Sequence, residues 1–185
     1  RHHCYHLTGL RDYDYRGHHS RRAAQFEQKL KLLQSTDKNH LFVPESPDLG
    51  GFGYPLSKGL CNLDTLKFYE VMIGLDKAGF LEPFRHDGRK IAIEIGSGWG
   101  GFAYQFRTLF SNNTYVLVDL PQSLLFSGTY LKTLFPSANI LMLRGDESGI
   151  VLKDLAKYDF VFVPDYFWPK LDARGADIAI NTVSF

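Results

Sequence analysis

Apolar residues recur at helical spacing near the start of the chain. Phe26, Leu30 and Leu33 lie three or four positions apart, with charged residues between them, and this pattern predicts an amphipathic helix over 20–34. Packing against the rest of the protein is the expected role of this helix. The segment 44–55 is too rich in proline and glycine for regular structure. We therefore expect an ordered loop or lid there.

A second helical pattern contains Leu66, Tyr69 and Ile73. Asp64 precedes these residues and is the expected N-cap, because a short side chain with an acceptor oxygen can bind the free amides of a first helical turn. Gly79 is expected to end the helix, because glycine readily adopts the left-handed backbone found just beyond a helix end.

From about residue 89 the pattern changes to short apolar runs that alternate with helical patterns. Strands are predicted over 91–96, 114–119, 140–143, 160–163 and 178–180, and helices over 100–110 and 122–135. Strands separated by helices are typical of a parallel sheet with right-handed crossovers. The sequence therefore predicts an α/β fold with a Rossmann-like, doubly wound and mainly parallel sheet.

Two domains are expected. Residues 1–88 form a helical and loop extension that could serve as a lid, and residues 89–185 form the Rossmann-like domain. A doubly wound sheet usually has more strands than this sequence supplies, so we expect the sheet to be incomplete at its C-terminal end. The chain also begins with Arg1 rather than methionine. We interpret it as a fragment.

Composition narrows the function classes. The 185 residues carry a formal net charge of +1, which gives no support to a nucleic-acid partner. No apolar run approaches the ~20 residues that span a bilayer, and no signal-peptide pattern is visible, so we expect a cytoplasmic protein without a membrane span. Cys4 and Cys61 lie far apart in the sequence. This spacing fits a reducing compartment.

Five of the seven histidines lie in the segment 1–19, close to Cys4. A metal site is conceivable there. However, the adjacent pairs His2–His3 and His18–His19 lack the spacing of a structural zinc module. We therefore predict no metal centre.

A glycine-rich turn follows the predicted strand 91–96. Gly96, Gly98 and Gly101 match the dinucleotide fingerprint, and Asp119 closes the next strand about twenty residues later, where a carboxylate can bind a ribose. Both features indicate a nucleotide-type cofactor. The structural alternatives are a tight strand-to-helix connection for the glycines and a helix N-cap before Pro121 for Asp119.

The charges around the turn favour S-adenosylmethionine (SAM) over a dinucleotide. Glu94 stands two residues before the first glycine, where it would repel a pyrophosphate but attract a sulfonium and an ammonium group. No Lys or Arg occurs between residues 91 and 106 to reinforce phosphate binding. The alternative interpretation leaves Glu94 solvated.

Several segments together resemble the sugar O-methyltransferase family of SAM-dependent enzymes. The likeness spans roughly residues 45–185 and is carried chiefly by 94–101, 115–121, 158–164 and 177–185. It implies methyl transfer from SAM to a hydroxyl of a sugar or sugar-derived acceptor, either a small molecule or a glycan, often in modification of surface polysaccharides.

The resemblance also implies a set of cofactor-binding residues. Glu94 would face the methionine part of SAM, the turn would line the cofactor, and Asp119 would hold the ribose. The full set is Glu94, Gly96, Ser97, Gly98, Gly100, Asp119, Leu120, Asp146 and Asn181. Turn chemistry at a strand end explains Asn181 equally well, and loop binding explains Asp146 equally well.

The catalytic base is not identified by the sequence. Asp165 is a weak candidate, because it follows a predicted strand, and Asp146 is another. Two alternative functions stay open: a nicotinamide-dependent oxidoreductase that uses the same turn, and a catalytically silent binding fragment. The acceptor, the methylated position and the oligomeric state are not determined by the sequence.

Overall fold

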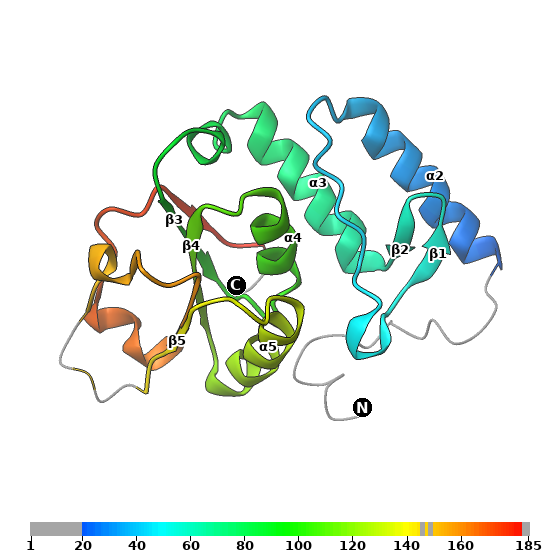
Figure 1. The fold of residues 1–185 in the computed structure, drawn as a ribbon. Coiled ribbons are helices and arrows are strands. Elements are labelled where there is room, and N and C mark those ends of the chain that lie inside the picture. Colours follow the sequence, from blue (N-terminus) through cyan, green and yellow to red (C-terminus); the bar gives the residue numbers. More distant parts are fainter. Residues whose placement is uncertain (1–19, 145–146, 148–149, 183–185) are drawn as a thin grey trace. The chain divides into compact units, whose positions relative to one another are not determined.

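A computed structural model describes residues 20–144, 147 and 150–182 (Figure 1). The chain divides into two compact units, Arg1–Gly79 and Phe80–Phe185. The segment 80–88, which the sequence pattern assigned to the extension, lies in the second unit. Leu81 is fully buried, and the Phe84 ring packs edge-on against Phe106 with centroids 5.0 Å apart. Burial of these side chains explains why the division comes before residue 80.

The first unit contains two helices and a hairpin. Its elements are α2 (Ser20–Thr36), the 3-10 turn η1 (Asp48–Gly50), β1 (Tyr54–Leu56), β2 (Gly59–Cys61) and α3 (Leu63–Lys77). Both helices were predicted. The expectation of a loop throughout 44–55 is partly wrong, because β1 pairs antiparallel with β2 and Glu45 bridges Leu60. The strand β2 lies outside the segment 44–55, and its pairing with β1 and with Glu45 orders part of this segment despite the proline and glycine content.

Asn62, not Asp64, caps the start of α3. The Asn62 Oδ1 accepts a 2.8 Å hydrogen bond from the Thr65 amide, and the Thr65 hydroxyl accepts one of 3.2 Å from the Asn62 amide. This reciprocal pair satisfies two backbone donors at once. The helix ends as expected, with Gly79 in the left-handed region just beyond the C-cap, Ala78.

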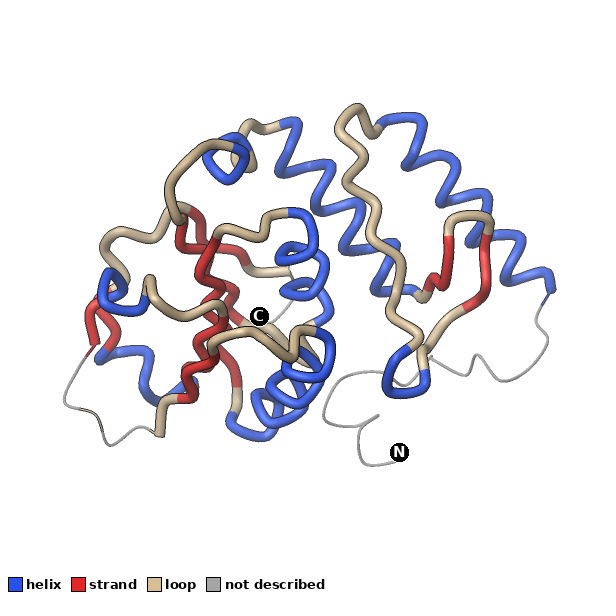
Figure 2. The backbone as a smooth tube through the Cα atoms, viewed as in Figure 1, coloured by secondary structure: helices blue, strands red, loops and turns tan. Residues whose placement is uncertain are grey.

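The second unit is an α/β sandwich around a parallel sheet (Figure 2). Its elements in chain order are η2 (Glu82–Arg85), β3 (Lys90–Ile95), α4 (Gly101–Leu109), β4 (Asn113–Asp119), α5 (Pro121–Leu134), β5 (Ile140–Met142), β6 (Ile150–Val151), η3 (Leu152–Leu155), β7 (Phe160–Pro164), η4 (Asp165–Lys170), β8 (Leu171–Asp172) and β9 (Ile178–Ile180). The sheet order is β5-β7-β4-β3-β9, and every pairing in it is parallel. The structure thus confirms the predicted Rossmann-like α/β fold.

Both faces of the sheet are covered, which explains the nearly continuous apolar runs of its strands. On one face, Ile93, Val116 and Val161 form a cluster with residues of η3 and η4. On the other face, α4 and α5 pack; the Phe106 ring lies 5.2 Å from that of Tyr115. The short pair β6–β8 lies outside the main sheet and was not predicted.

One carboxylate joins the amino ends of several strands. Asp159 Oδ1 accepts hydrogen bonds from Arg89 (2.9 Å) and Arg107 (2.7 Å), and its Oδ2 accepts one from the Asn139 amide (2.8 Å). Arg107 also donates to the Asn113 carbonyl at 2.7 Å. Burial raises the pKa of Asp159, but these hydrogen bonds and the two guanidinium charges together lower it below its ordinary value.

Asp159→Ala is expected to lower the free energy of unfolding by about 3 kcal/mol at pH 7, because it leaves two partly buried guanidinium groups without their carboxylate. Urea denaturation measures this loss. The folded-state pKa is lowered, so the contribution is complete above the ordinary value of 3.8 and disappears as the pH falls through the folded value. The difference between wild type and variant should therefore shrink only below pH 3.8.

The matched control is Asp87→Ala, which removes an exposed carboxylate of the same unit. It should change the free energy of unfolding by less than about 0.5 kcal/mol. Equal losses in the two variants would contradict a role for Asp159 in joining the strands.

Candidate functional site

The glycine turn connects the carboxyl end of β3 to α4. The Gly96 amide donates to the Val118 carbonyl of β4 at 2.8 Å, and the Gly100 amide donates to the Ser97 carbonyl at 3.0 Å. The first bond fixes the turn to the neighbouring strand, and the second closes the turn on itself. The turn is therefore held at both ends by backbone contacts.

Two glycines of the turn meet different surroundings. Gly100 has φ +88°, and a Cβ built on it would lie 3.0 Å from the Ser127 Cβ of α5. Gly98 has φ +55°, and a Cβ there would meet no atom within 4 Å. Gly100 therefore allows α4 to start close to α5, whereas Gly98 borders open space that a ligand can enter.

Asp119 holds the turn from the end of β4. Its Oδ2 accepts a 2.6 Å hydrogen bond from the Gly98 amide, and its Oδ1 accepts one of 2.7 Å from the Leu120 amide. The alternative of a helix N-cap is wrong, because α5 begins at Pro121 with Leu120 as its N-cap and no side-chain capping bond. A carboxylate offers about four lone-pair sites, so two remain for a ligand.

Glu94 lies beneath the turn. Its side chain is 1% exposed, and its carboxylate accepts a 3.1 Å hydrogen bond from the Tyr115 hydroxyl. The interpretation of a solvated Glu94 is therefore wrong. Burial, together with the nearby Glu94, raises the pKa of Tyr115 well above its ordinary value of 10, so the phenol stays a donor. Glu94 therefore belongs to the interior below the turn rather than to its exposed surface.

Ser97 provides an unused polar group in the turn. It is 6% exposed, and its Oγ has no hydrogen-bond partner among the residues that the structure describes. The start of α4 likewise has no side-chain capping bond. A buried hydroxyl without a partner costs about 1–3 kcal/mol. The hydroxyl and the helix start are thus suited to polar groups of a ligand.

The sheet order brings the other predicted residues to the same edge. Asn181 follows β9, which pairs with β3 so that Ile180 lies opposite Glu94. Asp165 follows β7, whose Pro164 lies opposite Asp119. Since all these strands are parallel, their carboxyl ends share one edge. Of the remaining predicted residues, Leu120 is 53% exposed at this edge, and Asp146 lies outside the described residues.

The edge contains the point where the direction of strand addition reverses. From β3 the chain continues to β4, β5 and β7 on one side, and it returns to β9 on the other side. In open α/β sheets, ligands bind outside the carboxyl ends at such a reversal. Tyr166, which follows Asp165, is 58% exposed beside it. The strand order, rather than the spacing along the sequence, places Tyr166 at this edge.

Neither a metal centre nor a membrane helix is visible in the described ranges. No group of three His, Cys, Asp or Glu residues there could hold a metal ion. No described helix combines the length and apolar character that a bilayer span requires. The histidine-rich segment 1–19 lies outside these ranges.

Gly100→Ala is expected to lower the free energy of unfolding by about 2–4 kcal/mol, because a left-handed alanine and the crowding against Ser127 both cost energy. Gly98→Ala should cost only the backbone term, about 1–2 kcal/mol. Urea denaturation of each variant, alone and with Ser127→Gly, separates the two causes. Ser127→Gly should reduce the free-energy cost of Gly100→Ala but should leave the cost of Gly98→Ala unchanged. A cost of Gly100→Ala that is the same with and without Ser127→Gly would refute the assigned contact.

Comparison of the chain with protein-family models, curated proteins and solved structures finds no match. The likeness to the sugar O-methyltransferases therefore stays an expectation from the sequence motifs. A functional conclusion depends on the residues at the carboxyl edge of the sheet.

Proposed function

We propose that this chain binds SAM at the carboxyl edge of the parallel sheet and transfers its methyl group to a hydroxyl of a sugar or sugar-derived acceptor. The observation that carries this proposal is the Asp119 carboxylate, which is bonded to the Gly98 amide beside the open side of the turn. It leaves acceptor sites next to open space, at the place where a ribose would lie.

A nucleoside fits the groups around Asp119. Vicinal ribose hydroxyls can donate to the unused lone pairs of the carboxylate, and such charge-assisted bonds are stronger than neutral ones. Leu120 follows directly and is 53% exposed, so it offers an apolar surface beside the carboxylate. Ser97 and the start of α4 supply polar contacts for the other end of the ligand.

Charge favours a cationic ligand over a pyrophosphate. The buried Glu94 places a carboxylate beneath the turn, where its field is weakly screened. The first basic residue after the turn, Arg107, is bonded to Asp159 and to the Asn113 carbonyl at the opposite edge of the sheet. A dinucleotide would therefore lack a side-chain cation from this segment. This asymmetry supports SAM rather than a nicotinamide cofactor.

The chain's own contribution to the reaction is positioning. Bound SAM supplies an electrophilic methyl group, and in-line displacement requires the acceptor oxygen to be aligned with it. With the ribose at β4 and the turn at β3, an acceptor would approach on the side of β9, next to Asn181. A sugar hydroxyl also needs a base within hydrogen-bond reach.

Calorimetry with SAM, S-adenosylhomocysteine and NAD(H) tests the cofactor. Wild type should bind both adenosyl ligands and not NAD(H). Asp119→Ala should weaken binding of both by about 10- to 100-fold, because a charge-assisted hydrogen bond is lost. Deleting the ribose 2′-hydroxyl from the ligand should weaken its binding to wild type but have little further effect on its binding to Asp119→Ala. Asp87→Ala is the control for an exposed carboxylate and should bind like wild type.

Binding of NAD(H) without binding of SAM would contradict this proposal and favour the alternative function of a nicotinamide-dependent oxidoreductase. Unchanged SAM affinity in Asp119→Ala, with the fold retained by circular dichroism, would remove the ribose assignment.

Transfer of a labelled methyl group from SAM tests the acceptor class. Label should appear in carbohydrate acceptors and be absent from catechols and peptides incubated in parallel. Label in a catechol or peptide but not in any carbohydrate would contradict the acceptor class and leave the cofactor assignment intact.

A further inference from the structure

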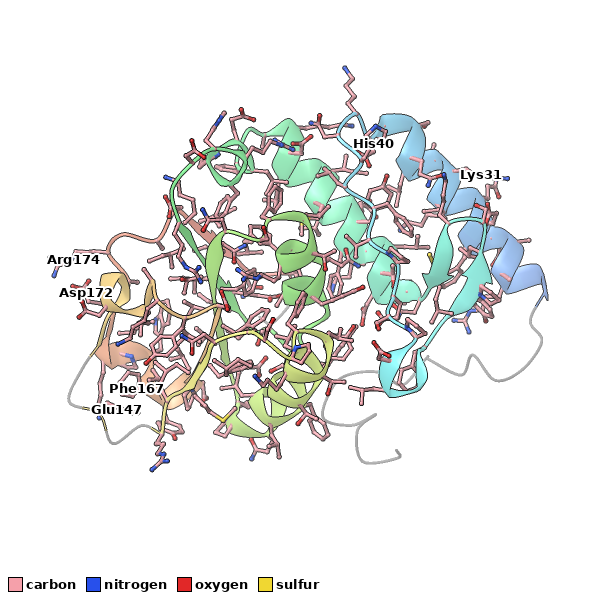
Figure 3. All side chains as sticks on the ribbon, viewed as in Figure 1. Lys31, His40, Glu147, Phe167, Asp172 and Arg174 are labelled. Carbon is pink, nitrogen blue, oxygen red and sulfur yellow. The ribbon has the colours of Figure 1, made fainter. Side chains whose placement is uncertain are left out.

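The outward side of α5 is nearly free of charged residues. This helix packs against the sheet with one side and directs the other side away from it (Figure 3). The exposed residues among its 14 are Pro121, Gln122, Leu125, Thr129, Lys132 and Thr133, which we call the outer stripe. Leu125 is 64% exposed. A surface helix ordinarily carries several charged residues on its outer side. The outer stripe has one, Lys132, and no acidic residue.

The polar groups of the outer stripe are largely bonded within the chain. The Thr129 hydroxyl donates to the Leu125 carbonyl, and the Thr133 hydroxyl donates to the Thr129 carbonyl, each at 2.8 Å. Lys132 Nζ donates to two carbonyls of the loop after the helix, at 2.8 and 3.2 Å. A threonine whose hydroxyl is bonded to the helix backbone offers mainly its methyl group to other contacts. This surface can therefore lose water without leaving these polar groups unpaired.

The apolar surface continues onto the edge strand β5. Met142 ends this strand and is 47% exposed, and its Cε lies 3.1 Å from the place where a Cβ on Gly128 of α5 would be. Leu125 precedes Gly128 by almost one helical turn. Among the described strands, β5 pairs only with β7. Two large exposed apolar side chains thus border the same part of α5, as is typical of an interaction surface.

The chemistry of this surface favours a protein partner. A nucleic acid would require cations, and a sugar chain would require many hydrogen-bond donors and acceptors, whereas the threonine hydroxyls and the Lys132 ammonium are already used within the chain. The centres of protein interfaces are depleted of charged residues. An uncharged aliphatic surface fits that composition.

The spacing of the exposed residues favours a second copy of the same chain. Positions 121 and 133, 122 and 132, and 125 and 129 are equally far from position 127. A two-fold axis through position 127, perpendicular to the helix, therefore places the outer stripe against itself. The large Leu125 then lies level with the smaller Thr129 of the second copy. The two Lys132 residues are separated by about 15 Å along the helix axis, so their like charges do not meet.

We propose that the outer stripe of α5, together with Met142, is the contact between two copies of this chain, packed antiparallel about a two-fold axis at position 127. This inference is independent of the proposed function. One helix pair gives a small contact, so the dimer is expected to be weak, with a Kd of about 10–100 µM.

Sedimentation equilibrium over a range of protein concentrations measures this association. Leu125→Asp should weaken the dimer at least about 10-fold, because it places an unpaired charge in an apolar contact. The matched control is Leu32→Asp, which changes a leucine of similar exposure (66%) on α2 in the other unit. It should leave the Kd unchanged. Both leucines are exposed, so the variants are expected to fold, and circular dichroism checks this.

Disulfide trapping tests the antiparallel register. In a Cys4→Ser background, mild oxidation of a mixture of Leu125→Cys and Thr129→Cys chains should give the mixed disulfide in excess over its random share, because position 125 lies level with position 129 of the second copy. Cys61 does not interfere, since it is fully buried and burial raises the pKa of its thiol to about 12. Leu32→Cys should give no comparable cross-link.

Three outcomes would overturn the inference. Wild type that remains a monomer at about 500 µM has no such contact. A dimer that Leu125→Asp leaves intact has its interface elsewhere on the molecule. A dimer that Leu125→Asp dissociates, but in which the mixed disulfide shows no excess, does not have the antiparallel arrangement about position 127.

Discussion

The hydrogen bond from the Gly98 amide to Asp119 Oδ2, 2.6 Å long, is the contact on which the site depends. It joins the turn after β3 to the end of β4, and it exists because the parallel register places Ile95 opposite Val118. Asp119 then follows at the height of the turn. The same carboxylate fixes the backbone and keeps lone pairs for a ligand, so local order and binding capacity come from one group.

The two edges of the sheet are built differently. At the amino edge, Asp159 is surrounded by donors from Arg89, Arg107 and the Asn139 backbone, which leaves little capacity for anything else. At the carboxyl edge, the Ser97 hydroxyl has no partner within the described part of the chain. A buried polar group without a partner is unusual in a folded protein. The Ser97 hydroxyl is therefore available to hydrogen-bond a ligand.

Three carboxyl groups at the carboxyl edge of the sheet differ in their exposure. Glu94 is buried and accepts a hydrogen bond from the Tyr115 hydroxyl. Asp119 is half-buried and shares its oxygens between backbone amides and the proposed ribose. Asp165 is exposed beyond the end of β7.

The sequence by itself determined the α/β class, the main helices and strands, and the glycine turn with Asp119, because helical and strand periods and glycine conformations are local properties. Only the tertiary structure decided that Asn62 caps α3, that Glu94 is buried and that β7 lies between β4 and β5. These features arise from pairing and packing between distant segments, which local patterns do not encode. The position of Asp165 beside Asp119 is therefore a consequence of strand order and could not be predicted from spacing along the chain.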